Sequence, residues 1–570
     1  MLGLGLWQAR LRSPLTWQEA DRVDAGAAFN AALSSAHPSR VWDWITAQHQ
    51  PILAPVLHGL AFVFTDDPVR AAWVPSALAF ALCGLLSAAL ARRLGAGKLG
   101  AWVAAVLVWT TPLTARLAGG AFTEGIGASL LVGLVILVQR ARTSFASAIG
   151  TGLVLAAAWW CSYDYGVLAM AILFAATAGD ALARAGPLRL AHNALAAGLA
   201  SVAVGAQLLV TSSSPDAVRY LSAFFRRSGT VGGAHLFYVR TLFKPSDFSH
   251  TELGIASAVG AILVLGLAWT LANWSRRREW HVPALAVGVW LVLFTAAASQ
   301  EARFIAVVLP VLASMTGAAI TDLVRHPEQR ARGLLIGTVV LAGVLLVVPD
   351  KNLGVRLIPV VAALGLLAYG LPRSTGGRVS HGMLVGAVAA AVAVQVGPQL
   401  AGMRDQLWLV KPNPPASQAL VFLATADRPA TGRPVVLLGA SSALSPALLQ
   451  LMWHLEPGGA STSVVTVADA ARTRRDDQLV ETITRHRPAY VITVRTGSGS
   501  RLSPSTDGAG DGVAASQREY AHLGPILARR GLLKLSSSFS LDSDPVRIDI
   551  WTVVPGGEPA LRGAETEARP

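Results

Sequence analysis

Charge is scarce in this sequence, and its scarcity excludes an ordinary soluble domain. Only 14% of the 570 residues are charged, whereas 53% are hydrophobic and the mean hydropathy is +0.50. Cysteine is scarce too: Cys83 and Cys161 lie in or beside apolar runs, which argues against a disulfide scaffold or a thiolate metal site. The predicted outer loops lack metal-ligand spacings of the H-x-x-H, C-x-x-C or D-x-D type, so no metal ligand is assigned and a need for a divalent metal stays open.

Long apolar runs, by contrast, are abundant. A helix needs about 20 mostly apolar residues to cross a bilayer. On that basis the sequence predicts a polytopic α-helical membrane protein with twelve spans, at 70–91, 99–115, 121–139, 144–161, 164–182, 190–211, 252–274, 281–299, 302–322, 333–349, 354–372 and 380–402.

The distribution of Lys and Arg predicts the orientation of these spans. Alternate short connections carry 15 cations, for example Arg92, Arg93 and Arg276 to Arg278, whereas the short loops of the opposite side carry four. The cation-rich side is therefore predicted to be cytoplasmic. The net charge of +14 follows from these loops, so it indicates anionic headgroups and not nucleic acid as a partner.

This orientation predicts the domain organisation. Residues 1–69 form an external N-terminal loop with interfacial helices, and 70–403 form the transmembrane domain, with a long external loop at 212–251. That loop contains "RYLSAFFRRSGTVGGAHLFYVRTLF", which suits an interfacial helix, passive or functional. Residues 404–556 form an external domain, and 557–570 a disordered tail.

The external domain is predicted to be a small α/β layer domain. "PVVLLGA", "TSVVTV", "AYVITVR" and "VRIDIWTVV" have the composition of strands, and they alternate with "ALLQLMWHL", "DQLVETITRHR" and "REYAHLGPILARRG", which have the pattern of helices.

Several charged and polar residues fall near the predicted external face, where they are candidates for a site. They are Asp21, Asp24, His49, Arg116, Glu124 and Arg303. A charge at membrane depth costs up to a few kcal/mol and therefore needs a partner or a function. For Arg303 the alternative to a function is an ion pair with Glu301 that only fixes the helix end.

Several segments of the sequence resemble those of a known family of membrane enzymes. "HQPILAPVLHGLAFVF", the following span and "TARLAGGAFTEGIG" look like the GT-C superfamily of membrane glycosyltransferases, in the protein O-mannosyltransferase and aminoarabinose transferase group. "SQEARFIAVVLPVLASM" resembles a later "R-Y-x-x-P-x-x-P" segment of that group, and the resemblance covers residues 20–325 in order. The group has a span before its acidic loop, whereas this sequence begins at the loop.

The resemblance implies a transferase that takes a sugar from a polyprenyl phosphate at the outer face of a bacterial inner membrane, with the C-terminal domain on the periplasmic side. The acceptor would be a lipid, glycan or protein. It implies a catalytic carboxylate, for which "DAGAAFNAAL" favours Asp24 over Asp21. Arg303 would bind the donor phosphate. Gln50 stands where some relatives carry Lys, with His49 as the replacement contact; Arg116 and Glu124 are further substrate-binding candidates.

Two other functions stay open. A transporter or flippase of a lipid-linked substrate would show internal repeats and broken spans in matching positions, and no clear repeat occurs. A catalytically degenerate relative with a binding role is the second alternative.

Overall fold

The structure is a computed structural model, and it describes most of residues 17–326 and the strands of the C-terminal region. The described residues are 17–35, 37–48, 51–65, 68–141, 144–183, 186–212, 237–243, 257–273, 278–296, 302–326, 339–340, 435–438, 464–466, 490–496, 528, 533–540 and 546–553. The chain divides into two compact units. One comprises Met1–Arg10, Ala32–Leu57 and Ala72–Leu409; the other comprises Leu11–Ala31, His58–Ala71 and Val410–Pro570.

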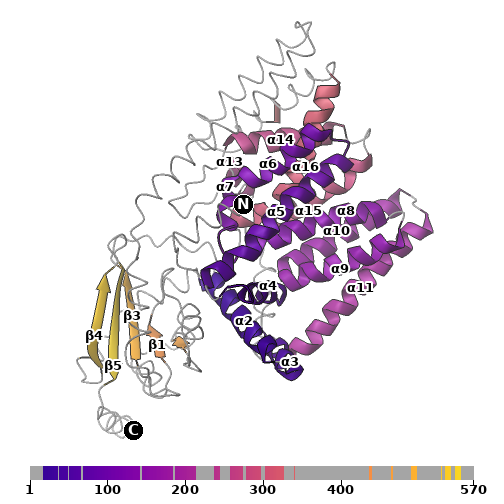
Figure 1. Ribbon diagram of the computed structural model, residues 1–570. Coiled ribbons are helices and arrows are strands. Elements are labelled where there is room, and N and C mark those ends of the chain that lie inside the picture. The colour runs from indigo at the N-terminus through magenta and orange to yellow at the C-terminus, as the bar shows by residue number, and fades with distance from the viewer. Residues whose placement is uncertain are drawn as a thin grey trace, which may run out of the picture. The chain divides into compact units, whose positions relative to one another are not determined.

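Helices account for nearly all of the described N-terminal part (Figure 1). They are α2 (Trp17–Ser34), α3 (Pro38–Ala47), α4 (Leu53–Phe62), α5 (Pro68–Arg93), α6 (Lys98–Thr110), α7 (Pro112–Leu117), α8 (Glu124–Ala141), α9 (Phe145–Cys161), α10 (Tyr163–Leu182), α11 (Pro187–Ser212), α13 (Phe237–Phe243), α14 (Ser257–Ala272), α15 (His281–Ala296) and α16 (Ile305–Arg325), with single 3₁₀ turns η1 (Arg278–Trp280) and η2 (Ala302–Phe304).

The predicted spans from 70–91 to 302–322 each coincide with a helix: α5, α6, α8 to α11 and α14 to α16. The span predicted at 99–115 is shorter than expected, because α6 ends at Thr110 and Pro112 starts the separate helix α7. The spans predicted at 333–349, 354–372 and 380–402 lie outside the described residues, apart from the helical positions 339–340.

Five of the described helices are long and apolar enough to cross a membrane. They are Arg70–Arg93, Tyr163–Leu182, Pro187–Val210, Arg278–Ala296 and Ala302–Leu323. On α5, Leu78, Leu82 and Leu85 share one face and are each about half exposed, whereas Phe80 and Cys83 are fully buried. A helix that is apolar on its exposed face as well as its buried face is typical of a membrane span.

Helix α16 lies at the centre of this bundle, with 89% of its apolar window buried. It packs on α6, α8, α14 and α15. Gly100 of α6 and Gly317 of α16 bring the two backbones together, because a Cβ on either glycine would collide with the carbonyl oxygen of the other. Small residues at such a crossing allow the close approach that membrane helices use for packing.

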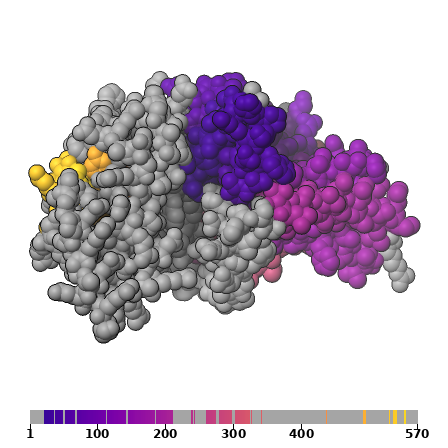
Figure 2. Space-filling model, turned by 90° about the horizontal axis from the view of Figure 1, so that it is seen from below, coloured from indigo at the N-terminus to yellow at the C-terminus, as the bar shows by residue number. Residues whose placement is uncertain are grey.

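Helices α8 to α11 pack side by side along one edge of the same bundle (Figure 1). In the space-filling view their purple and magenta side chains form a contiguous body (Figure 2). The amphipathic α3 touches α11, with Trp44 buried and Trp42 56% exposed.

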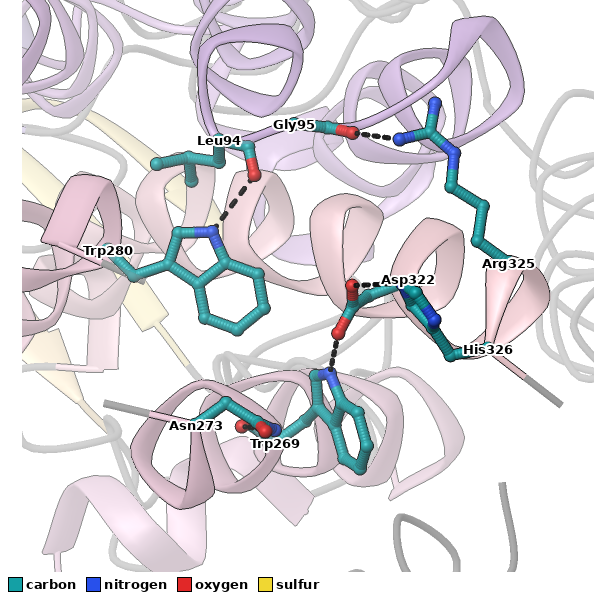
Figure 3. Close-up of polar contacts among 8 residues, drawn as sticks. All are labelled: Leu94, Gly95, Trp269, Asn273, Trp280, Asp322, Arg325 and His326. Carbon is teal, nitrogen blue, oxygen red and sulfur yellow. Dashed lines mark hydrogen bonds and ion pairs between the residues drawn. The ribbon is translucent and has the colours of Figure 1, made fainter. Parts of the chain in front are cut away.

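Hydrogen bonds tie four elements together at the Arg-rich end of the bundle (Figure 3). Helix α5 ends in a Schellman turn, with Gly95 at φ 93°, which glycine adopts without strain. The carbonyl oxygens left over there accept bonds from other elements: Trp280 Nε1 donates to Leu94 O at 2.9 Å and Arg325 Nη1 to Gly95 O at 3.1 Å. Trp269 Nε1 of α14 donates to Asp322 of α16 at 3.1 Å, which joins α14 to the same cluster.

In the other unit, α2 and α4 pack closely where Gly59 faces Gly26 and Phe29. The neighbouring His58 is fully buried, and its Nδ1 donates to Ala71 O at 2.9 Å. Burial, with a smaller contribution from the charge of Arg22, lowers the pKa of His58 to about 4. The imidazole is therefore neutral at pH 7.

The C-terminal region contains a five-stranded sheet in the order β2-β1-β3-β5-β4. Its strands are β1 (Val435–Leu438), β2 (Val464–Thr466), β3 (Tyr490–Thr496), β4 (Leu533–Ser540) and β5 (Val546–Val553). The first three are parallel to one another, and β5 runs antiparallel to both β3 and β4. Adjacent residues of β1 and of β3, such as Val491 and Ile492, are fully buried, so both faces of the central strands are covered.

All four predicted strands are confirmed, and β4 is an addition. Its sequence "LKLSSSFS" is rich in serine and lacks the apolar run that identified the others. It is an edge strand, paired only with β5, and such strands tolerate polar residues. The predicted helices of this region lie outside the described residues, apart from position 528.

Candidate functional site

Three helix starts bring ionisable side chains together in the membrane bundle. Glu124 is the first residue of α8, Asp164 is the second residue of α10, and Arg303 lies in the 3₁₀ turn η2 that leads into α16. They come from chain segments 40 or more residues apart in the sequence, so only the packing of α8, α10 and α16 places them in one electrostatic cluster.

Arg303 and Glu124 form a salt bridge, with 3.2 Å between Nε and Oε1. Glu124 is 1% exposed and Arg303 13% exposed at their side chains. The dipole of α8 stabilises the negative charge of Glu124 at its N-terminus. The positive charge of Arg303 is stabilised instead by the carboxylate of Glu124. A buried pair of this kind is costly to break, since either partner alone would be an uncompensated charge.

The second oxygen of Glu124 has no such partner. Oε2 is buried, and it accepts no hydrogen bond from any residue that the structure describes. A buried carboxylate oxygen without a donor costs free energy. It is therefore a position at which a ligand donor would be favourable.

Asp164 completes the charged cluster. Its carboxylate interacts electrostatically with Arg303, which attracts it, and with Glu124, which repels it. It is partly exposed, and within the described part of the chain it forms no salt bridge. The cluster of Glu124, Asp164 and Arg303 thus offers carboxylate acceptors beside one guanidinium donor.

Polar contacts hold the loop that precedes α8. Cys161 Sγ at the end of α9 donates a hydrogen bond to Thr123 O at 3.7 Å. The ring of Tyr165 occupies the space that a side chain at Gly127 would need. The start of α10 thus positions the start of α8, and with it Glu124.

Aromatic rings support Arg303 from the other side. Its guanidinium lies 5.6 Å from the ring centroid of Phe304, whose ring is 5.0 Å from that of Phe294. Phe294 stacks on Trp290 of the same helix, and Trp290 contacts Tyr238 of α13 at 4.8 Å. Helix α13, which lies within the segment 212–251 that was predicted to be an external loop, is thereby joined to the site through packed rings.

The sequence-predicted site residues have different outcomes. Arg303 and Glu124 come together. Asp21 and Asp24 lie on α2, half-buried, in the other unit, so their proximity to Arg303 stays a prediction. Arg116 lies in α7, and His49 and Gln50 lie outside the described residues.

The structure adds two points to the sequence-based expectations. Arg303 pairs with Glu124, and its pairing with Glu301 stays a prediction, because Glu301 lies outside the described residues. Asp164 was not among the candidates, because the span was predicted to begin at that residue. A carboxylate in "SYDYG", at the boundary of an apolar run, was the signal that could have found it. No group of three His, Cys, Asp or Glu side chains suited to a metal occurs among the described residues.

The arrangement of the helices is similar to that in two solved structures of one protein. The structure matches ArnT from Cupriavidus metallidurans in the apo state with a TM-score of 0.59 and 14% identity, over 96% of both chains. It matches the same protein bound to undecaprenyl phosphate with a TM-score of 0.55 and 16% identity, over 98% of this chain and 97% of that one. No protein-family model matches the sequence, and no curated protein matches it significantly.

Similarity at this level of identity establishes the fold. The protein is a polytopic α-helical membrane protein that shares the GT-C fold of ArnT and has a C-terminal strand-containing region. The resemblance found in the sequence is confirmed at the level of the fold.

Proposed function

We propose that the protein transfers a sugar from a polyprenyl-phosphate donor to an acceptor at the outer face of the membrane. The observation that carries the proposal is the buried Arg303–Glu124 pair at the convergence of apolar helix starts, within a GT-C fold. A neighbour of this fold has been solved with undecaprenyl phosphate, which supports a donor of that class.

Arg303 binds the donor phosphate in this proposal. Its planar guanidinium suits phosphate oxygens, and it stabilises the charge that grows on the phosphate as the sugar leaves. Glu124 holds the guanidinium in position, and the N-terminus of α16 favours an anion at the same place. Arg116, His49 and Gln50 are proposed as further donor contacts.

Asp24 acts as general base in this proposal, with Asp21 as the alternative. It removes the proton from the acceptor hydroxyl as that oxygen attacks the anomeric carbon, and the bond to the phosphate oxygen breaks. Attack opposite the leaving phosphate inverts the configuration. Because the cation-rich loops are predicted to be cytoplasmic, the reaction takes place at the external face of an inner membrane, where the C-terminal domain would also lie.

The test is transfer in proteoliposomes that contain the purified protein, polyprenyl-phosphate donors with labelled sugars, and lipid, glycan or peptide acceptors. The proposal requires that label moves from a donor to an acceptor and that Asp24→Asn, Asp21→Asn or both abolish the movement. Movement of the intact labelled lipid between leaflets without transfer would instead support a flippase. Donor binding with no transfer to any acceptor would support a degenerate relative.

A further inference from the structure

The cluster of Glu124, Asp164 and Arg303 contains two carboxylates and one guanidinium, and a phosphate site needs only the guanidinium. Arg303 is already paired with Glu124. Asp164 adds a second carboxylate at the start of α10, where the neighbouring Tyr165 packs on Gly127 of α8, and its charge interacts with both members of the pair. A bound phosphate would add further negative charge. The carboxylates therefore repel the phosphate, and its binding does not explain why both are there.

Among the described residues, one of the two oxygens of Glu124 lacks a hydrogen-bond donor. Glu124 Oε2 is buried and receives no hydrogen bond within the described part of the chain, and Asp164 forms no salt bridge there. Ionised carboxylates are acceptor-only groups. A ligand that satisfies them must bring N–H or O–H groups to a place next to a phosphate.

The sugar of a lipid-linked donor meets this requirement. Its hydroxyl groups are donors, and the ring that carries them is bonded directly to the phosphate oxygen. We propose that Asp164 and Glu124 bind hydroxyl groups of the donor sugar while Arg303 binds its phosphate. This inference rests on the proposed function and adds to it a residue, Asp164, that selects the donor by its sugar.

The two carboxylates are not equivalent in this scheme. Glu124 also holds Arg303, so its replacement disturbs both the phosphate and the sugar contact. Asp164 is partly exposed and is not needed to bury a charge, so its replacement by Asn removes a charged acceptor and keeps the size of the side chain. Asp164→Asn is therefore the discriminating variant.

The experiment compares the binding of two lipids, polyprenyl phosphate without a sugar and polyprenyl-phosphate hexose, to the detergent-solubilised full-length protein. Asp164→Asn should weaken binding of the sugar-bearing lipid by about 10- to 100-fold, as expected for a lost hydrogen bond to a charged group. Its affinity for sugar-free lipid should stay within about twofold of wild type or rise slightly. Donors lacking single hydroxyl groups should bind wild type more weakly, and at least one should bind wild type and Asp164→Asn alike.

Asp180→Asn is the matched control. Asp180 lies on the same helix α10, near its opposite end, where it pairs with Arg189 at 3.7 Å. This variant should leave both affinities unchanged. Equal loss of both lipids in Asp164→Asn, or full retention of sugar selectivity, would overturn the inference.

Arg303→Ala separates this inference from the proposed function. If wild type binds neither lipid, or binds sugar-free lipid equally well without Arg303, the proposed donor site itself is wrong. If Arg303 is needed for binding both lipids and Asp164→Asn keeps the wild-type ratio of affinities for the sugar-bearing and sugar-free lipids, only the role of Asp164 is wrong.

Discussion

Arg303 carries a charge to the start of an apolar helix, and the structure shows what compensates it. The carboxylate of Glu124, 1% exposed, lies 3.2 Å from its Nε. The pair is mutual, since Glu124 would be as costly alone as Arg303 would be. Removing one partner therefore has two effects, loss of the site and loss of stability, and a test of function must separate them.

Arg303→Ala should destabilise the protein by about 3–5 kcal/mol, because it leaves Glu124 buried without a counter-charge. The double variant Arg303→Ala with Glu124→Gln should recover most of that loss, since the amide carries no charge. Donor binding should be lost in both. The checks are thermal unfolding in detergent and lipid binding; a double variant as unstable as Arg303→Ala would contradict the pairing, and retained binding would contradict the phosphate role.

Asp24→Asn should lower transfer by about 10²- to 10⁴-fold, which is typical of a lost general base. The change keeps the size of a half-buried side chain, so the amount of folded protein should hardly change. Rates of label transfer for Asp24→Asn and Asp21→Asn, measured side by side, identify the base. If Asp21→Asn is inactive and Asp24→Asn is normal, Asp21 is the general base. If both variants are active, neither residue is the base and the proposed mechanism is wrong.

His58 predicts a pH dependence of stability. Its pKa is about 4 in the folded protein against an ordinary value of 6.5, so the unfolded chain binds the proton first as the pH falls. The neutral imidazole thus favours the folded state fully above pH 6.5, and this contribution declines between pH 6.5 and 4, by roughly 3 kcal/mol in total. Thermal midpoints across this range should fall less steeply for His58→Leu, and parallel curves would contradict the prediction.

At the scale of elements, close approach of backbones at glycine determines the packing of α6 on α16. A side chain at Gly100 or Gly317 would meet the carbonyl oxygen of the opposite glycine, and backbone cannot move aside as a side-chain end can. By contrast, no atom lies within 4 Å of a Cβ built at Gly133 of α8 or Gly198 of α11. These glycines offer a comparison within one molecule.

Gly100→Ala and Gly317→Ala should each cost about 1–3 kcal/mol, as overpacking does. Gly133→Ala and Gly198→Ala should be neutral or stabilise by up to about 1 kcal/mol, because alanine loses less conformational freedom in a helix. The check is to compare the thermal unfolding midpoints of the four purified variants with that of the wild type in one detergent. Similar effects at all four positions would contradict a tight α6–α16 contact in the folded protein.

At the scale of the whole molecule, the asymmetry of cations predicts the orientation. The connections on one side carry 15 Lys and Arg residues and the short loops on the other carry four. A periplasm-active reporter fused after Pro412 should be active, and the same reporter after Arg278 should be inactive. A reporter that is active only in the cytoplasm should give the opposite result: inactive after Pro412 and active after Arg278. A C-terminal region on the cytoplasmic side would overturn the orientation and the outer-face reaction with it.

The sequence alone determined the class of protein, the helices and the strands of the C-terminal region. These features depend on local composition: an apolar run of sufficient length must be a helix in lipid, because its backbone polar groups have no other partner. The same local rules missed β4, whose serine-rich sequence becomes a strand only because β5 pairs with it. They also placed the end of α6 five residues late, at the far side of Pro112.

Tertiary structure alone decided which charges meet. Arg303 pairs with Glu124, on a helix start 179 positions away in the sequence. Asp164 joins them from a third helix. No local pattern encodes these contacts, because they depend on how α8, α10 and α16 pack, and the need to compensate a buried charge specifies a partner of opposite sign without specifying where in the chain it lies.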